Sequence, residues 1–330
     1  MNNIRKKLID KVQRFEDIRV LVIGDVMLDI YEFCHSENSK PIDSEQPGKR
    51  AYRSHEIIKE LGGAGNVAAN LASLQIPVTL VGVTGQDEHY HKIVELARSH
   101  NINYFLHQDP SRTTTVKARL YVDDEYLLRR DDENIHKIDP EISNILTENI
   151  LSELPECNIV ILSDYNKGIF TKDNAQQIIN ECRKKKLPVI VDFKPDNADF
   201  FKGADLMVPN DTEAEQLLPE FSHAALKESM DKLHKKLQCN KLVVTLGAKG
   251  ICGFDGKDYF HVPGNKVIAI DAVGCGDTVR AALAVGIALE LSLKDAAILA
   301  NDAAAVIVQK PATASITRKE LIEFISNTIE

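Results

Sequence analysis

The segment DAVGCGDTV, residues 271–279, places closely spaced glycines, a cysteine and an acid directly before an apolar run suited to a buried helix. If a helix begins at Thr278, three main-chain N–H groups lie at its N-terminus, where unpaired donors and the helix dipole favour an anion. These N–H groups belong to Gly274, Cys275 and Gly276. Asp277 then lies in the first turn, where it can accept a proton from an attacking hydroxyl or can simply cap the helix.

Two other glycine-containing segments suggest ligand contacts. LGGAGNVAANLASL (61–74) is a second glycine-rich entry into a helix, with Asn66 and Asn70 one turn apart on one face. TLGAKG (245–250) has the form T-x-G-x-x-G, which is compatible with a phosphate cradle and equally with a hairpin turn.

The segment NDTE (210–213) separates an amide, Asn210, from a carboxylate, Glu213, by three positions. Such a pair suits Mg²⁺ held largely through water, or a helix N-cap with its first-turn glutamate. The sequence has neither a P-loop nor an N-terminal G-x-G-x-x-G, and it lacks H-E-x-x-H and G-x-S-x-G. P-loop NTPases, dinucleotide-binding domains, zinc proteases and α/β-hydrolases are therefore disfavoured.

The elements that must position these residues alternate between apolar strands and helical patterns. The predicted strands are RVLVIGD (19–25), VTLVGVTG (78–85), NIVILSD (158–164), LPVIVDF (187–193), DLMVPN (205–210) and KLVVTLG (241–247). Continuous apolar strands of this kind predict an α/β fold in which a parallel sheet is covered on both faces. Several of these runs end in Asp, Asn or Gly, and the carboxyl ends of such strands carry the ligand site.

Two more polar segments, 31–60 and 112–130, interrupt this alternation. The second predicts two short strands around a turn at Asp123-Asp124. We expect both segments to form a small β-lid on a single domain spanning residues 1–330, because no low-complexity linker divides the chain.

Composition excludes several classes of function. Forty basic and forty-nine acidic residues give a net charge of −9, which argues against nucleic acid or an anionic membrane as a partner. The six cysteines form no C-x-x-C pair, so neither a disulfide framework nor a zinc site is expected. No apolar run reaches the length of a membrane span, and residues 1–20 lack the apolar core of a signal peptide. We therefore expect a cytoplasmic protein.

The order of the chemical motifs resembles the ribokinase-like (PfkB) carbohydrate kinases over almost the whole chain. The motifs are GGAGN (62–66), N-x-x-E (210–213), T-x-G-x-x-G (245–250) and D-x-V-G-C-G-D (271–277). The last departs from the usual family form only at Ala272 and at Cys275, which replaces an alanine. The resemblance implies a three-layer α/β/α fold with a mostly parallel central sheet and a small β-lid.

Within that family, the chain looks most like the D-glycero-β-D-manno-heptose-7-phosphate kinases. The matching segments are GDVMLDIY (24–31), TTVKARLY (114–121), LLRRDDE (127–133), LSDYNKG (162–168), VDFK (191–194) and GDTVRAALAVGIAL (276–289). One segment departs from the heptose kinases, SKPIDSEQPGKRAY (39–52) in the first part of the lid. This departure leaves the exact sugar open.

The resemblance implies a role for each matched residue. Asp277 corresponds to the general base, and Gly274, Cys275 and Gly276 correspond to the anion hole. ATP contacts are implied for Thr245, Gly247, Gly250, Asn301 and Lys194, and Mg²⁺ contacts through water for Asn210 and Glu213. Sugar contacts are implied for Asp25, Asp29, Gly62, Gly63 and Asn66.

The 7-phosphate needs cations of its own. The candidates are Lys117 and Arg119, which share a face of one lid strand, and Lys167, which follows a predicted strand. A solvated strand face is the alternative explanation for these residues.

The leading hypothesis is an ATP- and Mg²⁺-dependent kinase that phosphorylates the anomeric hydroxyl of the heptose 7-phosphate. A kinase for another sugar or sugar phosphate and a catalytically silent sugar-binding protein are the alternatives. The family resemblance also implies a homodimer formed through the β-lid.

Overall fold

A sheet of nine strands runs through the body of the molecule, in the order β15-β14-β13-β12-β11-β10-β1-β6-β7. The architecture comes from a computed structural model, which describes residues 2–13, 15, 18–311 and 314–328. The strands of this sheet are β1 (Val20–Gly24), β6 (Val78–Gly85), β7 (Asn103–Asp109), β10 (Ile159–Ser163), β11 (Val189–Asp192), β12 (Leu206–Met207), β13 (Lys241–Thr245), β14 (Ile251–Phe254) and β15 (Tyr259–Val262).

The strands from β13 through to β7 all run parallel, and β14 and β15 are added antiparallel at one edge. All six predicted strands are present, so the prediction of an α/β fold with a mostly parallel sheet is confirmed. The apolar-run criterion missed β7, β14 and β15. β7 and β15 lie at the two edges of the sheet and mix polar with apolar residues, as in NYFLHQD of β7, whereas β14 is only four residues long.

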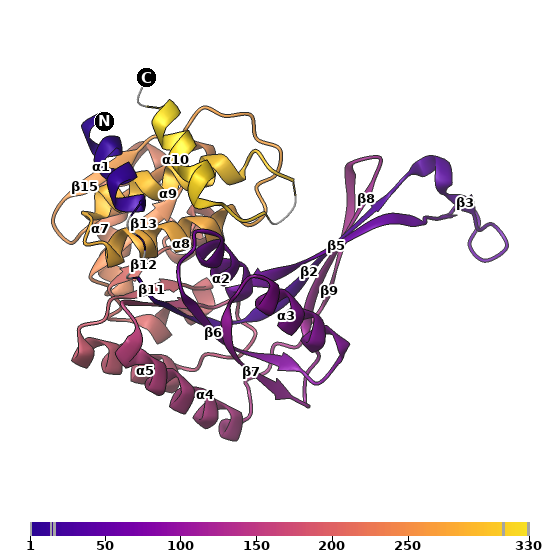
Figure 1. Cartoon of the computed structure of the whole chain (residues 1–330), viewed down its shortest axis with the longest axis horizontal. Coiled ribbons are helices and arrows are strands. Elements are labelled where there is room, and N and C mark those ends of the chain that lie inside the picture. The colour runs from indigo at the N-terminus through magenta and orange to yellow at the C-terminus, as the bar shows by residue number, and fades with distance from the viewer. Residues whose placement is uncertain (1, 14, 16–17, 312–313, 329–330) are drawn as a thin grey trace.

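Helices cover both faces of the sheet (Figure 1). Alternate residues of β1 point to opposite faces: Val20 and Val22 join one apolar core, and Leu21 and Ile23 join the other. The first core includes residues from α1 (Asn2–Val12), α2 (Ala64–Ser73), α3 (Glu88–Ser99), α8 (Cys275–Ala288), α9 (Leu293–Ile307) and α10 (Arg318–Asn327). The second includes residues from α4 (Pro140–Glu153), α5 (Lys172–Lys185), α6 (Asp211–Leu217) and α7 (Leu226–Leu237).

A separate sheet projects from this body, with the strand order β5-β2-β8-β9 (Figure 1). Its strands are β2 (Val26–Cys34), β5 (Ser54–Gly63), β8 (Thr115–Val122) and β9 (Glu125–Asp132). The predicted turn is present between β8 and β9, where Asp123 and Asp124 have φ values of 51° and 66°. The short strands β3 (Lys40–Pro41) and β4 (Arg50–Ala51) pair at the far tip.

The carboxyl ends of three neighbouring parallel strands deliver acids to one edge of the sheet. Asp25 follows β1, Asp164 follows β10, and Asp192 is the last residue of β11. All three side chains are buried. None of the helices in the described part of the chain is long and apolar enough to cross a membrane.

Candidate active site

Asp277 lies in the first turn of α8, at the carboxyl edge of the large sheet. The helix begins at Cys275, so the predicted start at Thr278 is wrong by almost one turn. Gly274 is the N-cap, with a φ of 79° that an L side chain rarely adopts. Residues 263–269, which lead toward this loop, carry no regular secondary structure.

The Asp277 carboxylate is held by side chains rather than by the helix N-terminus. Oδ2 accepts a hydrogen bond from Asn66 Nδ2 at 2.8 Å, and Oδ1 accepts one from the Tyr165 hydroxyl at 2.8 Å. Arg280 Nη1 lies 3.4 Å from the same Oδ1. Burial raises the pKa of Asp277, while Arg280 and the two hydrogen bonds act in the opposite direction. The capping role is thereby excluded, and the geometry fits a base in a desolvated site.

Asn66 is itself fixed by its neighbour on α2. Asn70 Nδ2 donates to both the carbonyl oxygen and Oδ1 of Asn66, at 3.0 and 3.1 Å. Thr278 Oγ1 in turn donates to Asn70 Oδ1 at 2.9 Å. The predicted asparagine pair thus connects α2 to α8 and orients an amide toward Asp277.

The loop before α8 presents main-chain donors beside the carboxylate. Across the described residues, no acceptor takes a hydrogen bond from the N–H of Gly274 or of Gly276, while the N–H of Cys275 reaches Ala272 O at 3.3 Å. Burial raises the pKa of the Cys275 thiol to about 11, so this side chain is neutral near pH 7. The loop can therefore bind an anion through its backbone.

Asp29 and Arg119 form a buried ion pair inside the projecting sheet β5-β2-β8-β9. Arg119 Nη1 donates to Asp29 Oδ1 at 2.9 Å. A Cβ placed on Gly62 would lie 2.7 Å from Asp29 Oδ2, so only glycine leaves room for this carboxylate. The sequence grouped Arg119 with Lys117, but the structure directs the Arg119 charge to Asp29.

Lys117 lies on β8 of the projecting sheet, and Lys167 lies in the loop after β10 of the large sheet. Lys117 Nζ is 5.0 Å from the centroid of the Tyr165 ring, and burial lowers its pKa. Lys167 Nζ pairs with Glu133 Oε2 at 2.7 Å. The pKa of Lys117 is lowered further by the nearby charge of Lys167, so the two cations belong to one neighbourhood.

The loop that carries Tyr165 and Lys167 is fastened to Asp25. The N–H groups of Tyr165 and Lys167 both donate to Asp25 Oδ2, at 2.7 and 3.1 Å. Burial and the nearby Asp164 raise the pKa of Asp25 to about 7. This carboxyl therefore orders the cationic loop.

Asn210 and Glu213 form a capping box at the start of α6. Asn210 Oδ1 accepts from the N–H of Glu213 at 2.8 Å, and Glu213 Oε2 accepts from the N–H of Asn210 at 3.0 Å. Glu213 Oε1 accepts from Lys194 Nζ at 2.6 Å, and Lys194 Nζ lies 5.2 Å from the centroid of the Tyr165 ring. The helix-cap alternative for this motif is therefore realised, and it leaves both side chains at the carboxyl edge of the sheet.

The T-x-G-x-x-G segment connects β13 to the antiparallel β14, so it is a hairpin turn. Thr245 forms an isolated bridge with Asn210. Gly247 has a φ of 56° and faces open space, whereas a Cβ on Gly250 would collide with Val262 O. Gly247 is thus accessible to a ligand, and Gly250 closes the turn.

Asn301 lies on α9 and does not contact the other candidates directly. Its Nδ2 donates to Pro263 O at 3.1 Å, and its carbonyl oxygen accepts from Asn265 Nδ2 at 3.2 Å. It therefore anchors the irregular segment that leads into the loop before α8.

Sequence reasoning missed three residues of this site: Tyr165, Asp192 and Arg280. A signal existed for Arg280, because an arginine inside an otherwise apolar helix is rarely buried without a partner. The two others follow or end predicted strands, but their partners lie far away in the sequence.

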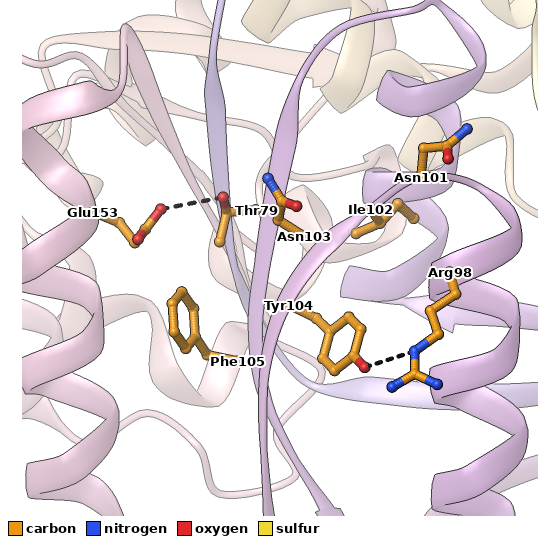
Figure 2. A pocket seen from close by; sticks show the side chains of 8 residues that line it. All are labelled: Thr79, Arg98, Asn101, Ile102, Asn103, Tyr104, Phe105 and Glu153. Carbon is orange, nitrogen blue, oxygen red and sulfur yellow. Dashed lines mark hydrogen bonds between the residues drawn. The ribbon is translucent and has the colours of Figure 1, made fainter.

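A polar cavity of about 600 Å³ lies at the opposite edge of the sheet, near the amino ends of β6 and β7 (Figure 2). Glu153 Oε2 accepts from Thr79 Oγ1 at 3.2 Å, and Arg98 Nε donates to the Tyr104 hydroxyl at 3.0 Å. Four of its polar side chains thus pair with one another, and none of its lining residues is among those around Asp277.

The fold and the sequence can be compared with known proteins. The phosphofructokinase-2 structure from Escherichia coli in complex with potassium superposes with a TM-score of 0.76 at 18% identity, covering 94% of this chain and 99% of that one. Arabidopsis thaliana ribokinase complexed with ribose and ATP superposes with a TM-score of 0.71 at 20% identity, covering 94% and 99%. These likenesses concern the fold.

Sequence similarity to curated proteins is higher. A D-beta-D-heptose 7-phosphate kinase of Bordetella bronchiseptica is 36% identical over 312 residues, which cover 94% of this chain and 96% of that protein. The bifunctional protein HldE of Trichlorobacter lovleyi is 31% identical over 326 residues, but the match covers only 66% of its length. The chain thus spans about two thirds of this bifunctional relative. Residues 17–320 match the family described as pfkB family carbohydrate kinase, and the chain therefore belongs to this family of carbohydrate kinases.

Proposed function

We propose that this protein is a kinase that transfers the γ-phosphoryl group of ATP to the anomeric hydroxyl of D-glycero-β-D-manno-heptose 7-phosphate. The 36% identity to a heptose 7-phosphate kinase over nearly its whole length supports the substrate. The observation that carries the chemistry is the buried Asp277 carboxylate, which stands beside unpaired loop amides at the start of α8.

Asp277 is the general base in this proposal. The anomeric hydroxyl gives its proton to the carboxylate as its oxygen forms a bond to the γ-phosphorus, and the bond from that phosphorus to the leaving ADP oxygen breaks. Asn66 and Tyr165 hold the two carboxylate oxygens in a fixed orientation, since each donates a hydrogen bond of 2.8 Å. The reaction consumes the monophosphate and yields the 1,7-bisphosphate and ADP.

The loop before α8 is the anion hole. The N–H groups of Gly274 and Gly276 and the N-terminal end of the helix dipole can stabilise negative charge on the transferring phosphoryl group. The neutral thiol of Cys275 adds no competing charge.

The nucleotide site combines the hairpin after β13 with the edge of the sheet. Thr245, Gly247, Gly250, Asn301 and Lys194 are its proposed residues. Gly247 supports this role because it faces open space, and Lys194 brings a cation next to Tyr165.

Asn210 and Glu213 are the proposed Mg²⁺ contacts. No group of three His, Cys, Asp or Glu side chains arranged to hold a metal occurs within the described ranges. A carboxylate and an amide fit an ion that reaches the protein mainly through water. When bound, Mg²⁺ neutralises charge on the phosphates.

The sugar phosphate is proposed to lie between the lid and the body. Asp25, Asp29, Gly62, Gly63 and Asn66 surround the sugar, and Lys117 and Lys167 bind the 7-phosphate. Arg119 acts through Asp29, with which it pairs at 2.9 Å. The divergent segment 39–52 includes β3 and β4 at the lid tip, remote from α8 (Figure 1), which favours retention of the heptose substrate.

We further propose that the chain works as a single kinase domain, with the sheet β5-β2-β8-β9 as its lid, and that two copies pair through their lids. Large apolar side chains on β5 and β9 are about half exposed, which supports such an interface: Ile57, Tyr126, Leu127 and Leu128. The reaction implies a place in the cytoplasmic synthesis of ADP-heptose for lipopolysaccharide.

A coupled ADP-release assay with purified protein tests the substrate. The panel contains heptose 7-phosphate, unphosphorylated heptose, fructose 6-phosphate and ribose, each with ATP and Mg²⁺. We expect the highest kcat/KM on heptose 7-phosphate. Faster turnover of another sugar would reject heptose 7-phosphate as the substrate but would still support a sugar kinase. Binding of sugar in calorimetry without any turnover would support a catalytically silent binding protein.

A further inference from the structure

Arg280 joins two buried carboxylates that come from distant parts of the chain. Its Nη1 lies 3.4 Å from Asp277 Oδ1, and its Nη2 lies 2.5 Å from Asp192 Oδ1. The Arg280 side chain is only 9% exposed. The guanidinium therefore connects the last residue of β11 to the first turn of α8.

The same guanidinium lies against the loop that precedes the helix. A Cβ placed on Gly276 would come within 2.6 Å of Arg280 Nη1. The two residues are four apart on one helix face, and Arg280 extends toward the helix N-terminus as helical side chains do. Gly276 thus leaves space for a cation beside both the loop and the base.

The ion pair between Arg280 and Asp192 is buried on both sides. Apart from Arg280, no residue in the described part of the chain donates a hydrogen bond to either Asp192 oxygen. Arg280 Nε also lacks a hydrogen-bond partner there. A buried ion pair is weak evidence for stability, because the desolvation of its two charges can exceed their attraction.

Several titratable groups face Asp277. They are Asp29 from β2, Tyr165 after β10, Asp192 from β11, and Cys275 and Arg280 from α8. Burial and the acids favour a protonated, inactive Asp277, and Arg280 supplies positive charge in direct contact with its carboxylate.

We propose that Arg280 is a positioning residue for phosphoryl transfer: held by Asp192, its guanidinium keeps the Asp277 carboxylate ionised and oriented toward the sugar hydroxyl. This inference rests on the proposed function, in which Asp277 is the base. Arg280 itself is buried, and its charge contacts run to Asp277 and Asp192.

The acid limb of the kcat profile against pH tests this role. Arg280→Gln removes the charge and keeps much of the side-chain volume, so we expect the limb to move to higher pH by about one to three units. The KM values for ATP and sugar phosphate should change little, since the residue acts on the chemical step. Arg280→Lys retains the charge and should return the limb most of the way toward the wild-type position.

The Asp192→Asn variant distinguishes an effect of the Arg280 charge from an effect of packing around Arg280. It removes the negative charge that pairs with Arg280 and leaves Arg280 in place. The acid limb of the kcat profile should therefore stay where it is or move to lower pH. Arg318→Gln is the matched control, because Arg318 on α10 contacts Leu74, Gln75 and Phe15 and none of the site residues. The acid limb of the kcat profile of Arg318→Gln should coincide with that of the wild type.

Three results would overturn the inference. They are a folded Arg280→Gln variant with an unmoved limb, an equal upward shift in Asp192→Asn, and a rise in KM for ATP as the main effect of Arg280→Gln. If Arg280→Gln does not fold, Arg280→Lys and Asp192→Asn still decide, because an upward shift in both would show that packing rather than charge sets the limb. Failure of the proposed function looks different, since an Asp277→Asn variant would then keep its activity.

Discussion

The Tyr165 hydroxyl donates a 2.8 Å hydrogen bond to Asp277 Oδ1, and the ring of the same tyrosine lies beside two lysines. Lys117 Nζ from the lid is 5.0 Å from the ring centroid, and Lys194 Nζ from the nucleotide side is 5.2 Å from it. Tyr165 therefore connects the proposed base with one lysine of the proposed sugar-phosphate site and one lysine of the proposed nucleotide site. Burial and the Asp277 charge raise the pKa of Tyr165 well above its usual value, so the phenol stays a donor.

Tyr165→Phe removes this donor and keeps the ring between the lysines. We expect kcat to fall about 10- to 100-fold, the range for one hydrogen bond to a charged group. The KM values should be nearly unchanged, because both lysines keep their aromatic neighbour. Steady-state kinetics measures the effect, and a purely KM-based loss would contradict the role given to the hydroxyl.

Asp277→Asn should lose about 10²- to 10⁴-fold in kcat, since the amide cannot accept the proton of the sugar hydroxyl. ATP affinity measured by calorimetry should be retained, because none of the residues proposed to contact the nucleotide is altered. Turnover at the wild-type rate would reject Asp277 as the base.

Lys117→Met and Lys167→Met should each raise KM for the sugar phosphate at least about tenfold, because each removes a charged partner of a phosphate. Turnover of the unphosphorylated sugar should change little. Lys185→Met is the control, since Lys185 is exposed on α5. An equal loss on both sugars would show that the lysines support folding of the site rather than phosphate binding.

Asp25 should make stability depend on pH. Its folded pKa of about 7 exceeds the ordinary value of 3.8, so its protonation favours the folded state. This contribution is complete below about pH 4 and is lost as the pH rises through 7. The Asp25→Asn variant keeps an oxygen that can accept from the N–H groups of Tyr165 and Lys167. In this variant the midpoint of urea unfolding should change less between about pH 4 and pH 7 than in the wild type. A slope equal to that of the wild type would show that Asp25 is ionised throughout.

Leu127→Asp on β9 should convert the proposed dimer into a single 36.7 kDa species in sedimentation, because an unpaired charge in an apolar interface is costly. Glu125→Lys on the same strand is a charge-changing control at an exposed position that is already polar. A wild-type protein that sediments as a monomer would reject the lid interface.

The sequence was sufficient for the elements whose determinants are local. Continuous apolar runs identified β1, β6, β10, β11, β12 and β13, because strands buried on both faces need apolar residues throughout. Closely spaced glycines before an apolar run located the loop before α8, although the helix begins earlier than expected, since Gly274 can adopt the positive φ of the N-cap. The β8–β9 turn followed from the tolerance of aspartate for positive φ.

Only the tertiary structure decided which charges meet. Arg119 seemed to share a task with Lys117, yet it neutralises Asp29 across neighbouring lid strands. Asn210 and Glu213 satisfy each other as a helix cap, which the motif alone left undecided. Tyr165, Asp192 and Arg280 come together from the loop after β10, from β11 and from α8, and no local pattern encodes contacts between residues so far apart in the chain. The sequence therefore determined the strands, the loop and the acid, and the packing of α8 against the sheet edge determined the electrostatic environment of that acid.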